Sequence, residues 1–295
     1  MDETGRGGAR RKRRSPPVRS AEVTIAKPRV GLVLGGGAVR GAAHVGALRA
    51  LEDNGFVPDL VCGTSIGALV GAAYAAGVPM ADVSEVFSDL RWKDVTRFSL
   101  RRGLAVFDTT PLRKLVERVI GDITFQDLGV DFAAVACDVV TGRRVVLTGG
   151  SVVDAVMASS ALPGLFMPYE SGDALLVDGG VVDNLPVDVA RSLGADYVVA
   201  IDVMPPGHVD RRPEDLRDML LTSFEIAQQT MKREGSQANC YIAPPISGFS
   251  MADFSVVQEL ERRGYDAVME AVPQLRQDLG LPETIPRTGT EEEPA

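Results

Sequence analysis

The sequence predicts an α/β protein with a mainly parallel sheet and helices on both of its faces. Two observations carry this prediction. Short apolar segments with strand character alternate along the chain with helical segments, and glycine-rich turns join several of them. Strands that alternate with helices are connected by crossovers, which favour parallel pairing. With 295 residues, 45% of them hydrophobic, the chain is long enough for one large domain of this kind.

The individual elements follow from local pattern. Strands are predicted where short apolar runs are bounded by glycine or polar residues, over residues 29–34, 57–62, 132–137, 145–147, 174–177 and 197–203. Helices are predicted from small-residue or amphipathic patterns, over residues 42–53, 68–77, 151–160, 186–193, 213–233 and 255–279. The last helix contains two candidate break points, Gly264 and Pro273.

The segment 63–67, Gly-Thr-Ser-Ile-Gly, is the most informative motif. It lies where a predicted strand passes into a predicted helix. A Gly-x-Ser-x-Gly turn at such a junction strains its serine and projects the hydroxyl from the sheet edge, and Gly63 and Gly67 make room for the turn. The helix N-terminus would also stabilise developing negative charge. Ser65 is therefore a candidate nucleophile.

A glycine-rich loop, residues 35–41, follows the first predicted strand and reads Gly-Gly-Gly-Ala-Val-Arg-Gly. The N–H groups of such a loop form an anion cradle, suited to a dinucleotide pyrophosphate or to the oxyanion of acyl transfer. A dinucleotide-binding site has an acidic residue at the end of the second strand. Asp59 instead precedes most of that strand, which ends in the serine turn. The cradle and the serine together favour acyl transfer.

The tripeptide Asp178-Gly179-Gly180 ends the strand predicted over residues 174–177. Taken alone it is typical of a loop or hairpin turn. The alternative interpretation is a carboxylate held at a strand end, facing Ser65. The tripeptide by itself does not decide between them.

At these three places together the chain resembles the patatin-like phospholipase family, in particular its bacterial members related to neuropathy target esterase. Residues 138–142, 158–168 and 184–186 also resemble family blocks, and all six blocks follow the family's order. One departure is visible: the commonest family loop is Gly-x-Gly-x-x-Gly, and its middle glycine is Ala38 here, which keeps the N–H donor. The resemblance implies a three-layer α/β/α fold with a mainly parallel central sheet.

The resemblance also implies the site residues. It places a Ser–Asp catalytic dyad on Ser65 and Asp178. It assigns the oxyanion hole to the N–H groups of Gly35, Gly36 and Gly37. Supporting motif positions are Arg40, Gly41, Gly63, Gly67, Gly179 and Gly180.

The implied activity is hydrolysis of acyl esters, of the phospholipase A or lysophospholipase type, with no cofactor and no metal ion. Aspartate with an ordinary pKa near 4 is a weak base for an alcohol, so partial burial that raises the pKa of Asp178 would help. The amide of Ile66, which follows the serine, is a further candidate donor.

Two other hypotheses stay open. A Ser–His–Asp triad of the α/β-hydrolase type needs a histidine, and the chain has only His44 and His208. The order Ser65, Asp178, His208 matches that class, but His208 lies in a polar, proline-rich segment and His44 has the spacing of a helix-packing residue. The other alternative is a non-catalytic adaptor that keeps the fold for partner binding, against which the intact motifs argue.

Charge is divided unevenly along the chain. Residues 1–20 hold seven basic and two acidic residues, so they carry +5 and the remainder carries −14 of the net −9. We predict a disordered basic tail over residues 1–28, a patatin-like domain over residues 29–282 and a disordered acidic tail over residues 283–295. The basic tail is either a plain extension or a tether to anionic lipid. No folded basic face indicates nucleic-acid binding.

Residues 78–125 mix apolar with basic side chains, which fits a peripheral pair of helices or a lid that contacts the membrane. Cys62, Cys137 and Cys240 are predicted to be buried free thiols, because they lie in apolar segments without Cys-x-x-Cys spacing. No run reaches the roughly 18–20 apolar residues of a membrane span, and the N-terminus lacks the apolar core of a secretory signal. We therefore expect a cytoplasmic protein, peripheral at the membrane at most, of undetermined oligomeric state.

Overall fold

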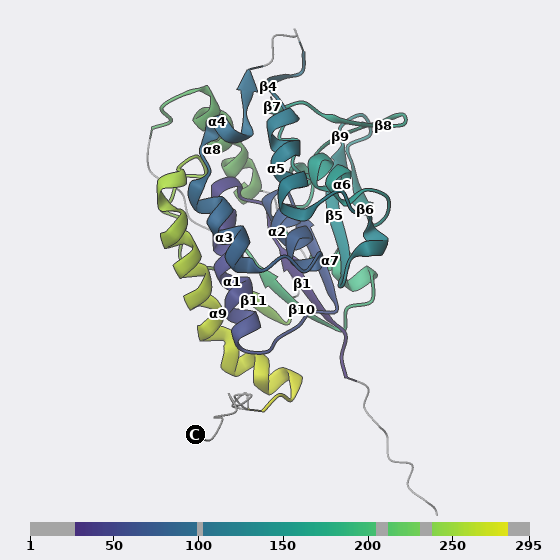
Figure 1. Ribbon diagram of the computed structural model, residues 1–295, viewed down its shortest axis with the longest axis vertical. Coiled ribbons are helices and arrows are strands. Elements are labelled where there is room, and N and C mark those ends of the chain that lie inside the picture. Colours follow the sequence, from purple (N-terminus) through teal and green to yellow (C-terminus); the bar gives the residue numbers. More distant parts are fainter. Residues whose placement is uncertain (1–26, 99–102, 205–211, 231–237, 283–295) are drawn as a thin grey trace, which may run out of the picture.

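The computed structural model describes residues 27–98, 103–204, 212–230 and 238–282 (Figure 1). In these residues the central sheet has eight strands in the order β11-β10-β1-β2-β5-β9-β8, with β6 paired to β5. The strands are β1 (Val30–Leu34), β2 (Leu60–Thr64), β5 (Asp131–Asp138), β6 (Arg143–Leu147), β8 (Tyr169–Ser171), β9 (Ala174–Asp178), β10 (Tyr197–Ile201) and β11 (Cys240–Ile242). The predicted tails fall outside the described residues, apart from positions 27 and 28.

The sheet is mainly parallel, as predicted. Strands β11, β10, β1, β2 and β5 pair in parallel, whereas β6, β9 and β8 add antiparallel partners beyond them. Every residue of β1, β2 and β10 is buried. Continuous apolar runs of this kind are typical of strands that are covered on both faces.

Two helical layers cover the sheet, which confirms the three-layer prediction. Side chains such as Leu32 and Val61 pack on one face, and Val33 and Leu60 pack on the other. The first face is covered by α1 (Ala42–Asp53), α2 (Ile66–Ala75), α3 (Met80–Asp89), α5 (Thr110–Ile120), α6 (Val152–Ser159) and α9 (Val257–Leu279). Helix α7 (Val187–Ser192) packs on the opposite face.

Helix α9 is continuous through both candidate break points, Gly264 and Pro273. The role of Gly264 is close packing. A Cβ atom there would overlap the carbonyl oxygen of Ala43 in α1, and a Cβ at Gly46 of α1 would overlap the carbonyl oxygen of Glu261. The two glycines let the α1 and α9 backbones touch, and Figure 1 shows these helices side by side.

The segment 78–125 differs from the predicted helical pair. Besides α3, α4 (Trp92–Val95) and α5, it contains β3 (Arg97–Phe98) and β4 (Ala105–Asp108). In the described residues these strands form a second, three-stranded sheet with β7 (Gly164–Phe166). Strands this short show no periodicity, and β4 pairs with a strand far along the chain, so only the tertiary structure reveals them.

A further apolar cluster lies between this small sheet and α8 (Leu216–Thr230), and its side chains include Phe107, Leu165, Met204 and Leu221. This cluster lies beyond the carboxyl end of β2, where the serine turn is found.

The remaining helical turns of the described residues are 3₁₀: η1 (Ala38–Gly41), η2 (Phe125–Asp127), η3 (Gly179–Val181) and η4 (Phe254–Val256).

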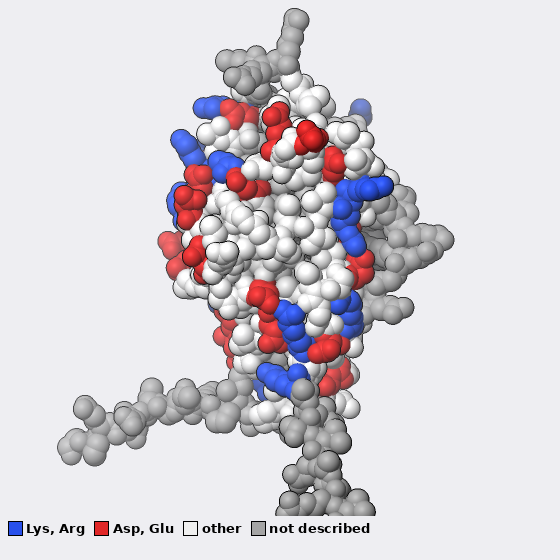
Figure 2. Space-filling view, turned by 90° about the vertical axis from the view of Figure 1, so that its right-hand side faces the viewer, with Lys and Arg blue, Asp and Glu red and all other residues white. Residues whose placement is uncertain are grey.

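The three cysteines are buried, as predicted, and are free thiols. Among the described helices, none combines the length and apolar character required to cross a bilayer. On the face in Figure 2, lysine and arginine are interspersed with aspartate and glutamate and do not gather in one basic area.

Candidate active site

Ser65 occupies a strained turn between β2 and α2. Its backbone has φ 54° and ψ −122°, and Ala38 is the only other described non-glycine residue with positive φ. Such a conformation costs about 1–3 kcal/mol and persists only where its surroundings impose it. Here they do: a Cβ at Gly67 would overlap the carbonyl oxygen of Leu34, and one at Gly63 would overlap that of Gly67. Gly63 and Gly67 thus leave the space that this turn needs.

A second serine, Ser159 of α6, fixes this turn. The Ser65 N–H donates to the Ser159 Oγ at 2.9 Å, and the Ser159 hydroxyl donates to the Val135 carbonyl at 2.5 Å. Ser159 is fully buried. It belongs to the block 158–168, and nothing in the local sequence pattern distinguishes it from a packing residue.

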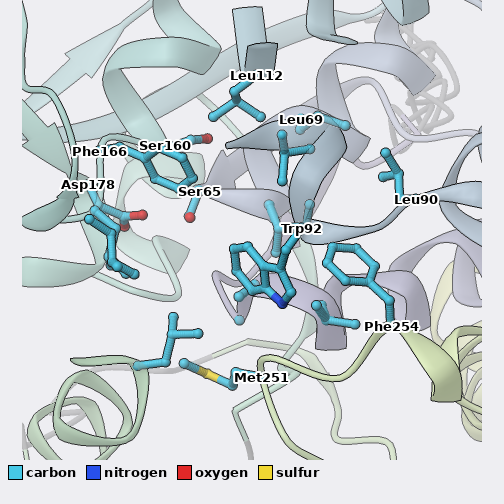
Figure 3. A pocket seen from close by; sticks show the side chains of 18 of the residues that line it. Ser65, Leu69, Leu90, Trp92, Leu112, Ser160, Phe166, Asp178, Met251 and Phe254 are labelled. Atoms are coloured by element: carbon cyan, nitrogen blue, oxygen red, sulfur yellow. The ribbon is translucent and has the colours of Figure 1, made fainter. Parts of the chain in front are cut away.

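Asp178 lies directly beside Ser65, although the two are far apart in sequence. It pairs with Ala136 of β5, and Thr64, which precedes the serine, pairs with Val135. Figure 3 shows the Ser65 hydroxyl oxygen facing the carboxyl oxygens of Asp178, and the interaction with this hydroxyl lowers the pKa of Asp178. Tertiary structure therefore places Asp178 where the second interpretation of its tripeptide required it.

The environment of Asp178 raises its basicity. The side chain is 1% exposed and accepts a hydrogen bond from the Gly180 N–H at 2.8 Å. Burial raises the pKa of Asp178 to about 6, and the hydrogen bonds from Ser65 and Gly180 oppose this rise. Gly179 and Gly180 are needed for close packing, because Cβ atoms there would overlap the Val135 carbonyl oxygen and approach the Phe224 ring to 2.7 Å.

The glycine loop presents two unpaired N–H groups to the site, but not all of those expected. The Gly35 N–H donates to the Ile201 carbonyl at 3.1 Å, and the Gly36 N–H donates to the Asn184 carbonyl at 3.2 Å. In the described part of the chain the N–H groups of Gly37 and Ala38 have no acceptor, and both residues line the cavity that contains Ser65. Of the three predicted donors, Gly35 and Gly36 are engaged elsewhere and only Gly37 is unpaired, with Ala38 as an additional donor.

Arg40 and Gly41 anchor the loop. The Arg40 side chain is fully buried and forms a 2.8 Å ion pair with Glu225 of α8. It also donates to the carbonyl groups of Phe249 and Ser247, so it points away from the cavity. A Cβ at Gly41 would overlap the Ile66 side chain, which brings the loop against the start of α2.

His44 and Asn184 hold the other side of the loop. The His44 Nε2 lies 2.7 Å from the Gly35 carbonyl oxygen, and burial lowers the pKa of His44 to about 4. The ring is therefore neutral and donates from Nε2. The Asn184 Nδ2 donates to the Gly36 carbonyl at 3.1 Å. His208 lies outside the described residues.

A narrow apolar cavity of about 120 Å³ opens beside Ser65 and Asp178. Among the described residues that line it, Asp178 is the only ionisable one. In Figure 3 the Ser65–Asp178 pair lies at one side of the view, and Leu90 and Phe254 lie at the other. The apolar lining residues include Leu69, Phe87, Leu90, Trp92, Leu112, Leu162, Phe166, Leu221, Met251 and Phe254. Within the described residues no cluster of histidine, cysteine and carboxylate side chains has a metal-binding arrangement.

Comparison with known proteins identifies the family. The family model described as patatin-like phospholipase matches residues 32–191, which is more than half of the chain. The chain belongs to the patatin-like phospholipase family. The match spans the glycine loop, the serine turn and Asp178-Gly179-Gly180 of this patatin-like protein, so the resemblance noted from its motifs is confirmed.

Its relatives include fungal lysophospholipases. Lysophospholipase NTE1 of Pyricularia oryzae is 30% identical over 285 residues, and that of Phaeosphaeria nodorum is 32% identical over 290 residues. Each alignment covers 86% of this chain but only 19% of the relative, so the patatin-like chain spans about a fifth of their length. The crystal structure of VipD from Legionella pneumophila matches with a TM-score of 0.52 and 13% identity, covering 84% of this chain and 67% of VipD, which shows a shared fold.

Proposed function

We propose that this patatin-like protein is a serine hydrolase of lipid acyl esters that works through a Ser65–Asp178 dyad. The observation that carries the proposal is that the Ser65 hydroxyl faces a buried carboxyl group beside an apolar cavity. A nucleophile in contact with its base is the arrangement that covalent catalysis requires. The unpaired N–H groups of Gly37 and Ala38 are the proposed donors to the oxyanion.

The chemistry follows from these positions. Asp178 takes the Ser65 proton as Oγ attacks the ester carbonyl carbon, and the tetrahedral oxyanion forms near the N–H groups of Gly37 and Ala38, with the Ile66 N–H as a further donor. Collapse expels the alcohol, which receives the proton from Asp178. Water, deprotonated by Asp178, then attacks the acyl-enzyme, and the fatty acid leaves as Ser65 Oγ takes the proton back from Asp178.

The raised pKa of Asp178 suits this role. A carboxylate with a pKa of about 6 is a stronger base than an ordinary aspartate and is still mostly ionised near neutral pH. The direct contact with Ser65 leaves no place for an imidazole between the two side chains. His44, committed to the Gly35 carbonyl and absent from the cavity lining, also supports the dyad over a triad.

The cavity supports an acyl chain as the group bound there. Its lining is apolar apart from Ser65, Asp178 and Ser160, and it begins at Ser65. An apolar chain would therefore place its ester carbonyl at the nucleophile. The relatives described as lysophospholipases support phospholipid-derived esters as the substrate class.

We further propose that the substrate comes from a membrane surface. Two apolar side chains near the cavity are unusually exposed for their type, Phe98 at 74% and Leu216 at 61%, and we call them the apolar patch. Phe98 and Leu216 share a hollow with Lys93, whose charge suits anionic headgroups, while the other charged groups of the hollow form ion pairs, Arg97 with Asp108 and Arg217 with Asp215. Leu165 lines both this hollow and the acyl cavity, so the two are neighbours.

Covalent labelling tests the dyad. A fluorophosphonate probe is expected to modify Ser65 in the full chain and to leave Ser65→Ala unlabelled. Ser160→Ala is the matched control, since Ser160 lines the same cavity but its Oγ has no hydrogen-bond partner among the described residues and hence no base there. Intact-mass analysis that finds no adduct on the folded wild-type protein would overturn the proposal and favour a non-catalytic adaptor.

Hydrolysis assays define the substrate and the mechanism. Purified protein is expected to release fatty acid from phospholipid or lysophospholipid in a panel of lipid classes, with Ser65→Ala as the blank. His208→Ala is expected to keep kcat within a few-fold, because the dyad uses no histidine. Loss of activity in that variant as complete as in Ser65→Ala would indicate a triad.

A further inference from the structure

Asn184 forms hydrogen bonds with both backbone polar groups of Gly36, one residue of the glycine loop. Its backbone carbonyl accepts the Gly36 N–H at 3.2 Å, and its side-chain Nδ2 donates to the Gly36 carbonyl at 3.1 Å. Asn184 is 8% exposed and is not among the residues that line the acyl cavity. It therefore acts on the loop and has no direct contact with the space that the substrate would occupy.

The planar geometry of the peptide unit means that this contact also sets the direction of the Gly37 N–H. The Gly36 carbonyl and the Gly37 N–H belong to the same peptide unit, and in a trans peptide these two groups point in opposite directions. Because Asn184 Nδ2 holds the Gly36 carbonyl on one side, the Gly37 N–H is turned to the other side. Gly37 lines the cavity with Ser65, and its N–H has no acceptor in the described part of the chain.

The fit around Gly36 is close enough to make this orientation rigid. A Cβ added there would lie 2.6 Å from Asn184 Oδ1 and 3.3 Å from the Ser65 Cβ. The loop is thus packed between the asparagine and the serine. The preceding peptide is held in the same way, with the His44 ring on the Gly35 carbonyl and the Asn184 carbonyl on the Gly36 N–H.

We infer that Asn184 is a positioning residue, which aims the Gly37 N–H at the oxyanion formed on the substrate of Ser65. The inference rests on the proposed function and deepens it by assigning the group that orients the donor. Without the Nδ2 donor, the Gly36 carbonyl loses its hydrogen-bond partner and the Gly37 N–H is no longer held toward the oxyanion. Removal of one oxyanion donor typically lowers kcat by about 10²–10³-fold.

The test compares Asn184→Ala with Asn184→Asp in the full chain. The aspartate keeps the shape of the side chain and replaces the Nδ2 donor with an oxygen, so it tests the donor even if the alanine variant fails to fold. Its kcat is taken from the plateau of the pH profile, because a second carboxylate would shift the pKa of Asp178. Asn54→Ala is the matched control: Asn54 Nδ2 donates to the Ala50 carbonyl at 2.9 Å, at the end of α1.

Three readouts separate positioning from simple stabilisation. On a soluble short-chain ester, kcat is expected to fall about 10²–10³-fold in both Asn184 variants while KM stays within a few-fold. The Ki of an alkyl trifluoromethyl ketone, whose adduct with Ser65 carries an oxyanion, is expected to rise by the same factor as kcat/KM falls. Binding of the corresponding fatty alcohol, which forms no oxyanion, is expected to stay unchanged, and Asn54→Ala keeps all these values.

The outcomes are distinct. A folded Asn184 variant with kcat within a few-fold of the active wild type overturns the inference and leaves the dyad intact. A fall in kcat without a matching rise in the ketone Ki also overturns it, because the loss would then not act through the oxyanion. A wild-type protein that neither hydrolyses esters nor forms the ketone adduct overturns the proposed function and this inference with it.

Discussion

Ser65 and Asp178 meet because the strands that carry them end opposite adjacent residues of one common neighbour. Strand β2 runs parallel to β5 and its last residue, Thr64, pairs with Val135. Strand β9 runs antiparallel to β5 and ends with Asp178 opposite Ala136. The carboxylate and the hydroxyl are therefore set by the ladder of a buried sheet, which holds them more rigidly than loops would.

The first prediction concerns the base. Asp178→Asn keeps the shape of the side chain but cannot accept the serine proton, so kcat on a soluble ester is expected to fall about 10²–10⁴-fold. Stability above about pH 6 is expected to be maintained or increased, because the substitution removes a buried charge. Kinetics and thermal unfolding of the same preparation measure both effects. An active Asp178→Asn enzyme would remove this carboxylate from the mechanism.

The second prediction is the pH profile. Since the pKa of Asp178 is raised to about 6, kcat/KM is expected to rise with pH and level off above that value, as the base loses its proton. The free energy of unfolding is expected to change with pH in the opposite direction. The folded protein binds this proton more tightly than the unfolded chain does, so this group's contribution to the free energy of unfolding declines between about pH 4 and pH 6. Rate and denaturation measurements across this range check both; a rate independent of pH there would contradict the assignment of the base.

The third prediction concerns the apolar patch. Replacing Phe98 and Leu216 together with serine is expected to weaken binding to anionic vesicles, because both side chains are largely exposed and would lose their burial in lipid. Hydrolysis of a soluble short-chain ester is expected to stay within a few-fold. Vesicle co-sedimentation and a soluble-ester assay give the two readouts.

The matched control for the patch is Val57→Ser. Val57 is 67% exposed but precedes β2, whereas Ser65 follows it, so it lies at the opposite end of the sheet. Equal loss of vesicle binding in both proteins would argue against a defined membrane face. The predicted effect of deleting residues 1–20, weaker binding to anionic vesicles at low salt, concerns residues outside the described structure and stays a sequence-based prediction.

The fourth prediction concerns the contact between α1 and α9. Gly264→Ala is expected to destabilise the protein by about 1–3 kcal/mol or more, because the added Cβ overlaps the Ala43 backbone, which cannot move aside cheaply. Gly149→Ala is the control, since a Cβ there meets no atom within 4 Å. Denaturant unfolding of both variants makes the comparison. Equal midpoints would show that the helices separate without cost.

Much of the fold and part of the site could be predicted from local sequence. The apolar runs of β1 and β10, the glycine loop and the Gly-x-Ser-x-Gly turn all depend on interactions within a few residues, and periodicity and turn chemistry report on those directly. The strain at Ser65 was predictable in the same way, because it is built into the strand-to-helix junction. The boundaries of the patatin-like domain at residues 29 and 282 stay a prediction.

The tertiary structure decided which distant groups meet. The Asp178 tripeptide is an ordinary turn until β5 places it beside Ser65, and the free donors of the glycine loop depend on which carbonyls engage Gly35 and Gly36. Asn184 lies far along the chain from the loop that it orients. The sequence by itself determined the chemical groups, since these reside in single residues. Their partners are determined by packing across the whole chain, which no local pattern encodes.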